Sequence, residues 1–139
     1  MYHIFESALS KEYLSEWSEI AGGFDLIKGY TELGDIFLIN SETNEIAILF
    51  PLSNTVEPMG YTNWPEFSCS VLNNLGFQNE VVRKEHLERV AEHCGKLGQQ
   101  QIYYAVPLPL LGGSGATDSY KIGDLWVYLA IVYQSLNEI

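Results

Sequence analysis

Basic residues are scarce in this sequence: seven Lys and Arg stand against 18 Asp and Glu, which gives a formal net charge of −11. A strongly acidic surface repels the phosphates of nucleic acids and of anionic lipid headgroups, so neither a nucleic acid nor a membrane is an expected partner. Such a surface attracts a basic protein and speeds encounter with it. The shortage of basic residues therefore favours a protein partner of opposite charge.

Cysteine and long apolar runs are also rare. Only Cys69 and Cys94 are present, too few for a disulfide-stapled scaffold, and we expect two small buried thiols, with a disulfide as the alternative. The first residues lack the basic start and apolar run of a secretory signal. No stretch approaches the roughly 18 apolar residues that span a bilayer. These absences indicate a cytoplasmic protein.

The residue patterns of an active site or a metal centre are missing too. His86 and His93 are separated by two helical turns, roughly 10 Å, and no CxxC, HxxxH or HExxH occurs. We expect surface histidines, no metal and no cofactor. The Gly-rich segment 112–115 is not followed by the Lys of a phosphate-binding loop. It is expected to be a flexible or contact-making loop, with a ligand loop as the alternative.

What the chain does have is enough apolar sequence for a core. Hydrophobic residues make up 47% and aromatic residues 13% of its 139 residues, which excludes general disorder and indicates one domain over residues 1–139. Residues 35–40 and 45–50 are apolar at consecutive positions, which is typical of strands covered on both faces. Apolar spacing also predicts the following elements: helices 10–21, 79–97 and 124–137, a helix beginning after Asn63, and strands 26–31 and 101–106.

This order of elements predicts an α+β domain, with a mostly antiparallel sheet packed against several helices, including one near each terminus. The acidity is uneven along it. Residues 1–80 hold 12 acidic residues and only Lys11 and Lys28, a net charge of −10, whereas residues 81–139 have a net charge of −1. We expect carboxylates of the first part to steer a partner, although a single surface Glu is more often merely solvated. The candidates are Glu12, Glu16, Glu19, Glu32, Asp35, Glu42, Glu45, Glu57 and Glu66.

Aromatic residues near loops and strand ends are candidate apolar anchors for an interface. These are Tyr30, Tyr61 and Trp64, for which packing under a loop is an equally good interpretation. The loop formed by Gly112, Gly113, Ser114 and Gly115 is a further candidate contact.

Several short segments, in a fixed order, resemble the C-terminal domain of the type VI secretion DNase-immunity family. They are Gly34-Asp35-Ile36-Phe37, the Pro51-Leu52 corner, Val106-Pro107, Leu111-Gly112-Gly113 and the final Tyr128-Leu129-Ala130-Ile131 helix. The similarity covers about residues 24–136. A more distant similarity is to the Smi1/Knr4-like immunity superfamily.

The resemblance implies a stoichiometric inhibitor, kept in the bacterial cytoplasm, that binds and neutralises a secreted toxin, a nuclease effector of the type VI system. A nuclease has a basic DNA-binding cleft that an acidic protein can occupy. It implies no catalytic activity. The alternative from another class is a small-molecule or peptide-binding regulatory module, with the Gly112–Gly115 loop over a pocket lined by Tyr103 and Tyr104. A third possibility is an enzyme of unrecognised type.

Overall fold

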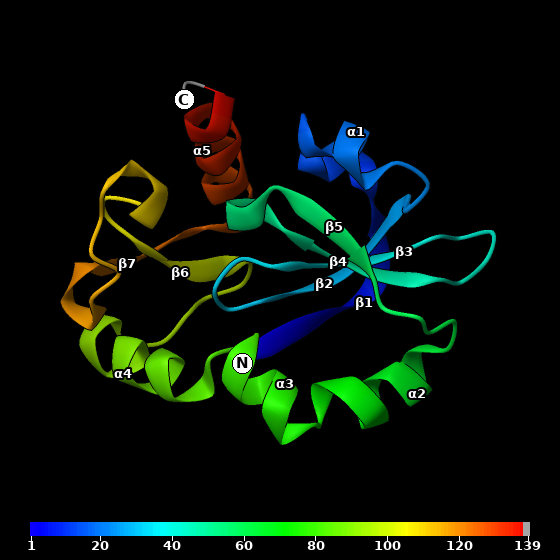
Figure 1. The fold of residues 1–139 in the computed structure, drawn as a ribbon, viewed down its shortest axis with the longest axis horizontal. Helices are drawn as coiled ribbons and strands as arrows, with labels where there is room; N and C mark the ends of the chain where they lie inside the picture. The colour runs from blue at the N-terminus through cyan, green and yellow to red at the C-terminus, as the bar shows by residue number, and fades with distance from the viewer. Residues whose placement is uncertain (138–139) are drawn as a thin grey trace.

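A five-stranded antiparallel sheet lies at the centre of the computed structural model, which describes residues 1–137 (Figure 1). The strands follow one another in chain order, and a second sheet of two antiparallel strands stands beside the first. The strands of the large sheet are β1 (Tyr2–Ser10), β2 (Leu26–Thr31), β3 (Ile36–Ile39), β4 (Ile46–Phe50) and β5 (Thr55–Pro58); those of the small sheet are β6 (Gln101–Ala105) and β7 (Tyr120–Asp124). The predicted α+β class is confirmed.

Strands β3 and β4 are buried on both faces, as their continuous apolar sequence predicts. Ile36, Phe37 and Leu38 are each 0% exposed, and so are residues 46–49. Ile36 and Leu38 pack in a core cluster with the last helix and residues 14–21, whereas Phe37 packs in another with residues 67 and 72. The sheet is therefore the middle of three layers, with helical segments on both sides (Figure 1).

The helices are short. They are α1 (Trp17–Ala21), α2 (Trp64–Phe67), α3 (Leu75–Glu80), α4 (Lys84–Cys94) and α5 (Leu125–Asn137). Single turns of other helix types lie between them: η1 (Lys11–Leu14), η2 (Pro51–Ser53), η3 (Ser68–Leu72), η4 (Pro109–Leu111) and η5 (Thr117–Ser119). The expected start of α2 is confirmed, because Oδ1 of Asn63 accepts a hydrogen bond of 2.9 Å from the backbone N–H of Glu66. Oδ2 of Asp124 accepts one of 3.0 Å from Val127 N–H and caps α5 in the same way.

Two of the predicted helices are interrupted by residues with positive φ. The helix expected over 10–21 breaks at Ser15, where φ is 52°, into η1 and α1, although Leu14 and Trp17 are buried as the spacing requires. The helix expected over 79–97 covers only 84–94, because Arg83 has φ 58° and separates α4 from α3. A residue with a Cβ atom is strained in the left-handed region of φ and ψ, and a right-handed helix cannot continue through it.

Three strands were not predicted from the sequence. Strand β1 pairs with β2 only at residues 2–4 and 9–10, with an irregularity between them that removes the regular alternation of apolar side chains. Strands β5 (TVEP) and β7 (YKIGD) lack the continuous apolar sequence that identified β3 and β4.

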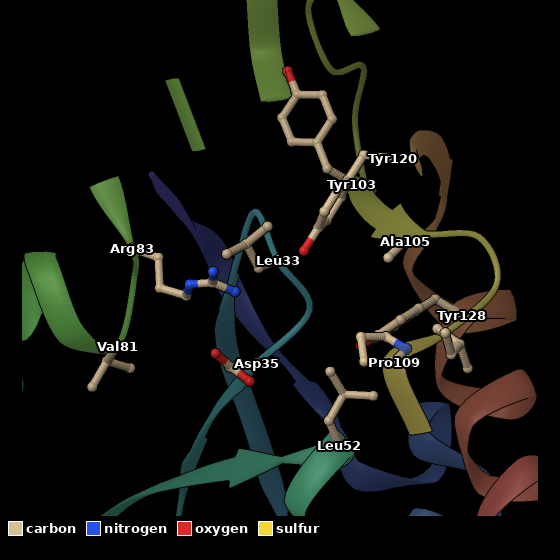
Figure 2. A pocket seen from close by; sticks show the side chains of 11 residues that line it. Leu33, Asp35, Leu52, Val81, Arg83, Tyr103, Ala105, Pro109, Tyr120 and Tyr128 are labelled. Carbon is tan, nitrogen blue, oxygen red and sulfur yellow. The ribbon is translucent and has the colours of Figure 1, made fainter. Parts of the chain in front are cut away.

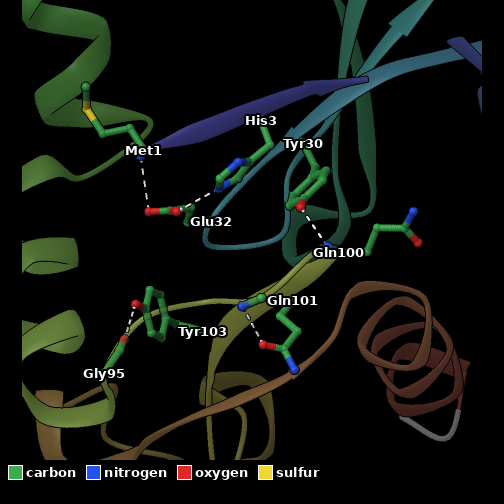
Figure 3. A network of polar contacts seen from close by, with 9 residues as sticks. Met1, His3, Tyr30, Glu32, Gly95, Gln100, Gln101 and Tyr103 are labelled. Carbon is green, nitrogen blue, oxygen red and sulfur yellow. Dashed lines mark hydrogen bonds and ion pairs between the residues drawn. The ribbon is translucent and has the colours of Figure 1, made fainter. Parts of the chain in front are cut away.

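Hydrogen bonds between residues far apart in sequence join the small sheet to the large sheet, among them that between Tyr30 and Gln100 (Figure 3), and join α5 to α1. The N–H of Tyr103 donates to the carbonyl of Glu32 at 2.9 Å, and that of Gln100 donates to the Tyr30 hydroxyl at 3.0 Å. The indole N–H of Trp17 donates to the carbonyl of Leu129 at 2.8 Å in the buried core. The two sheets therefore belong to one folded body.

The cysteines and histidines lie only partly where they were expected. Both thiols are free, but Cys69 is exposed and Cys94 is partly buried, so the expected burial of Cys69 is wrong. Cys69 lies on η3, between Phe67 and Leu72, which face the core. His93 is exposed, whereas the ring of His86 packs edge-on against that of Tyr120 at 5.1 Å and is only partly exposed.

No helix among residues 1–137 combines the length and the apolar character needed to cross a bilayer.

Candidate functional site

Most of the candidate carboxylates lie at one end of the molecule, which we call the acidic end. The segments that carry them are η1 and α1, the β3–β4 turn, β5 and α2, all on the side away from β6 and β7 (Figure 1). Glu45 is partly buried and the others are exposed. The residues of the acidic end are Glu12, Glu16, Glu19, Glu42, Glu45, Glu57 and Glu66.

Asp25, which was not among the candidates, ties two of these segments together. Its carboxylate accepts hydrogen bonds from the N–H of Ser41 at 2.8 Å and from the Ser41 hydroxyl at 2.6 Å. The hydrogen bond from the Ser41 hydroxyl is the larger cause and that from the Ser41 N–H the second; together they hold the pKa of Asp25 below its usual range. The loop after α1 is thereby fixed to the β3–β4 turn, and a surface hollow lies between them.

Among residues 1–137, no carboxylate of the acidic end forms an ion pair shorter than 4.0 Å. Within residues 1–137, the ion pairs shorter than 4.0 Å all involve Glu32, which pairs with the amino group of Met1 at 3.1 Å and with Nε2 of His3 at 2.8 Å (Figure 3). The two lysines of the acidic part contact neutral groups instead. Lys11 donates to the carbonyl of Gly22 at 2.8 Å, and Lys28 lies over the ring of Trp64, 5.6 Å from its centre. Lys11 also contributes, as the smallest cause, to the lowered pKa of Asp25, and the seven carboxylates of the acidic end are left without a close ion pair in the described part of the chain.

Glu32 and Asp35 lie apart from the acidic end, in and beside the β2–β3 turn. Burial would raise the pKa of Glu32, but hydrogen bonds from His3 and the chain terminus outweigh it and lower the pKa. Asp35 is partly buried and lines an internal cavity. Neither carboxylate is placed to steer a partner toward the acidic end.

The aromatic candidates mainly serve the core. Tyr30 is 3% exposed, and a ring so buried offers no surface for an anchor. Trp64 and Tyr61 are partly buried, and their rings pack against Phe67 at 5.3 and 5.6 Å. Trp64 belongs to α2, which is part of the acidic end.

The Gly-rich loop lies at the opposite end of the molecule, beside β7 (Figure 1). Its first half closes η4, because Gly112 N–H donates to Pro109 and Gly113 N–H to Leu108, both at 3.0 Å. Ser114 is exposed and Gly115 partly so. One flat partner surface could not include both this loop and the acidic end.

A cavity of about 120 Å³ lies where the β2–β3 turn, the start of α4, β6 and α5 meet (Figure 2). Tyr103 lines it, as one of the alternatives predicted, but Tyr104 and the Gly-rich loop do not. The reason is the pleat of β6, which sends consecutive side chains to opposite faces. The ring of Tyr104 packs against that of Tyr128 instead, at 6.1 Å.

No group of three or more His, Cys, Asp or Glu side chains within residues 1–137 is arranged to hold a metal ion.

Comparison with known proteins gives a fold relationship. No protein-family model and no curated protein matches this chain. Among solved structures, it is similar to the crystal structure of Atu4351 from Agrobacterium tumefaciens, with a TM-score of 0.65 over 96% of this chain and 21% sequence identity. The chain spans 66% of the length of that protein. At this level of identity the similarity shows a shared α+β fold.

Proposed function

We propose that this protein is a bacterial immunity protein that binds a basic toxin and neutralises it. The toxin we infer is a secreted nuclease of the type VI system, and the complex forms in the cytoplasm of the cell that makes both. The observation that carries the proposal is the acidic end, where six exposed carboxylates and the partly buried Glu45 gather and both nearby lysines make their direct contacts with neutral groups. The resemblance of the Gly34–Phe37 and Leu111–Gly113 segments to an immunity family supports the same partner class.

Electrostatics explains why unpaired carboxylates suit this role. Exposed ion pairs within one protein contribute little stability, so leaving these carboxylates unpaired costs the fold little. Across an interface, the same charges raise the rate of encounter with a basic surface and disfavour wrong partners. A nuclease cleft is shaped to attract phosphates, and carboxylates compete for the same Lys and Arg side chains.

A co-expression experiment tests the proposal. The reading frame beside this gene is expressed alone and together with this protein in a host that lacks both. We expect arrested growth and degraded DNA when the neighbour is expressed alone, and normal growth when both are present. A harmless neighbour, or one whose toxicity this protein does not relieve, would contradict the proposal.

Two triple variants then locate the interface. Glu12→Gln/Glu16→Gln/Glu19→Gln removes three charges from the acidic end, and Glu85→Gln/Glu88→Gln/Glu92→Gln removes three exposed charges from α4. Both variants change the net charge equally. We expect the first variant to protect less well than the second at matched expression, and equal protection would remove the acidic end from the interface.

A further inference from the structure

Three polar groups that line the cavity of Figure 2, partly buried Asp35, buried Tyr128 and exposed Arg83, have few partners within the protein. The carboxylate of Asp35 accepts one long hydrogen bond, 3.5 Å from the hydroxyl of Thr31. Within residues 1–137 the hydroxyl of Tyr128 has no hydrogen bond, and the guanidinium of Arg83 has no ion pair shorter than 4.0 Å. These groups are left to interact with something other than this chain.

Asp35 and Arg83 both line the cavity (Figure 2). Asp35 comes from the β2–β3 turn, and Arg83 from the junction between α3 and α4. Burial raises the pKa of Asp35 to about 7, as expected for a carboxyl group without a close cation. An ion pair would offset the burial of the Asp35 carboxylate, yet no ion pair shorter than 4.0 Å joins it to Arg83.

The local backbone holds this arrangement in place. Gly34 has φ 98°, and a Cβ atom there would lie 2.4 Å from a ring carbon of Tyr128, so the turn that carries Asp35 is pressed against α5. Arg83 has φ 58° and ψ 56°, a conformation that a side chain other than Gly adopts at a cost. Strain of this kind is concentrated at functional sites.

We propose that the cavity binds a small zwitterion of the α-amino acid class, its ammonium group on Asp35 and its carboxylate on Arg83. This site goes beyond toxin binding. A simple cation would be repelled by Arg83 and a simple anion by Asp35, whereas a zwitterion satisfies both at once. The hydroxyl of Tyr128 can accept a further hydrogen bond from the ammonium group.

The size and the walls of the cavity limit the ligand. A single water needs only about 10–15 Å³, so about 120 Å³ accommodates several heavy atoms. Apolar side chains, among them Leu33, Leu52 and Val81, form much of the remaining wall. They favour a hydrogen atom or a methyl group as the amino acid side chain, which means glycine or alanine. The acidic end lies at the far end of β3, so the two sites do not overlap (Figure 1).

Titration by two-dimensional amide NMR tests the site in the intact protein. Glycine and L-alanine are added at constant ionic strength, and methylammonium and acetate serve as probes that carry one charge each. We expect saturable shifts of the amide signals of Gly34 and Asp35 with both amino acids, and at least about tenfold weaker binding of either single-charge probe. Absence of saturation by both amino acids at about 50 mM, far above a millimolar dissociation constant, would overturn the proposal. Equal binding of methylammonium or acetate would overturn it as well.

Variants separate the two ends of the ligand. Asp35→Asn and Arg83→Gln each remove one charge, and Lys96→Gln removes an exposed positive charge elsewhere as the control for Arg83→Gln. We expect glycine binding to weaken at least about tenfold in both cavity variants and to be unchanged in Lys96→Gln. Because Arg83 is exposed, its variant reports on binding even if Asp35→Asn folds poorly. Unchanged binding in Arg83→Gln would overturn the assignment.

Discussion

Replacing Asp35 by Asn should stabilise the protein at alkaline pH. Burial raises the pKa of Asp35 to about 7 in the folded protein, whereas the pKa of Asp in an unfolded chain is about 3.9. Between these values the folded state binds a proton that the unfolded state has released, so stability falls as the pH rises. Asn stays neutral at every pH and can still accept a hydrogen bond from the Thr31 hydroxyl.

The magnitude follows from the width of that pH window. Each pKa unit corresponds to about 1.36 kcal/mol, so a shift of about three units costs wild type up to about 4 kcal/mol above pH 7. The part of this window between pH 5 and pH 7 spans about two pKa units. The free energy of unfolding of Asp35→Asn relative to wild type should therefore rise by about 2–3 kcal/mol from pH 5 to pH 8.

Urea unfolding, followed by the fluorescence of the three Trp residues, measures this difference at both pH values. Asp25→Asn is the matched control, because the hydrogen bonds from Ser41 lower the pKa of Asp25 and make its charge stabilising above the unfolded pKa. It should gain no stability relative to wild type at pH 8. A difference between Asp35→Asn and wild type that stays constant from pH 5 to pH 8 would refute the reasoning.

Three further predictions concern packing and thiol access. Gly34→Ala should destabilise the fold by at least about 2 kcal/mol, because its Cβ would lie 2.4 Å from a ring carbon of Tyr128. Gly60 also has a positive φ, but no atom lies within 4 Å of an added Cβ. Gly60→Ala should therefore lower the free energy of unfolding by less in the same urea assay. Trp17→Phe should cost about 1–3 kcal/mol through loss of its buried hydrogen bond to α5, and a variant as stable as wild type would contradict this. Mass spectrometry after brief treatment with a thiol reagent should find Cys69 modified before Cys94, whose pKa is raised by burial; the reverse order would contradict the structure.

Strands β3 and β4 at the centre of the sheet could be predicted because residues 36–39 and 46–50 are apolar at consecutive positions. Residues 26–31, 35–40 and 45–50 correspond to β2, β3 and β4 within a residue at each end. Helical spacing placed Leu9, Tyr13, Leu14, Trp17, Ile20 and Ala21 on one apolar side. Leu14, Trp17 and Ala21 are buried, whereas Tyr13 and Ile20 are exposed. The break at Ser15 could not be foreseen, since no Gly or Pro marks its positive φ in the sequence.

The acidic end was partly predictable, but the cavity was not. Charge counting placed the acidity in residues 1–80, and the fold gathers most of it at one end while it turns Glu32 and Asp35 away. The cavity depends on Asp35, Arg83 and Tyr128, which are far apart in the sequence and meet only in the folded chain. A carboxylate at the start of a fully apolar strand was the one local signal of that site.

The rate of association with the toxin tests the central claim most directly. Stopped-flow measurements with a catalytically silenced toxin from the neighbouring reading frame should show a rate that falls at least about tenfold between about 20 and 300 mM salt. The Glu12/Glu16/Glu19 triple Gln variant should bind more slowly and with a shallower salt dependence than the matched α4 variant, because only the first removes charge from the acidic end. A salt-independent rate, or the same salt dependence in both variants, would contradict the account.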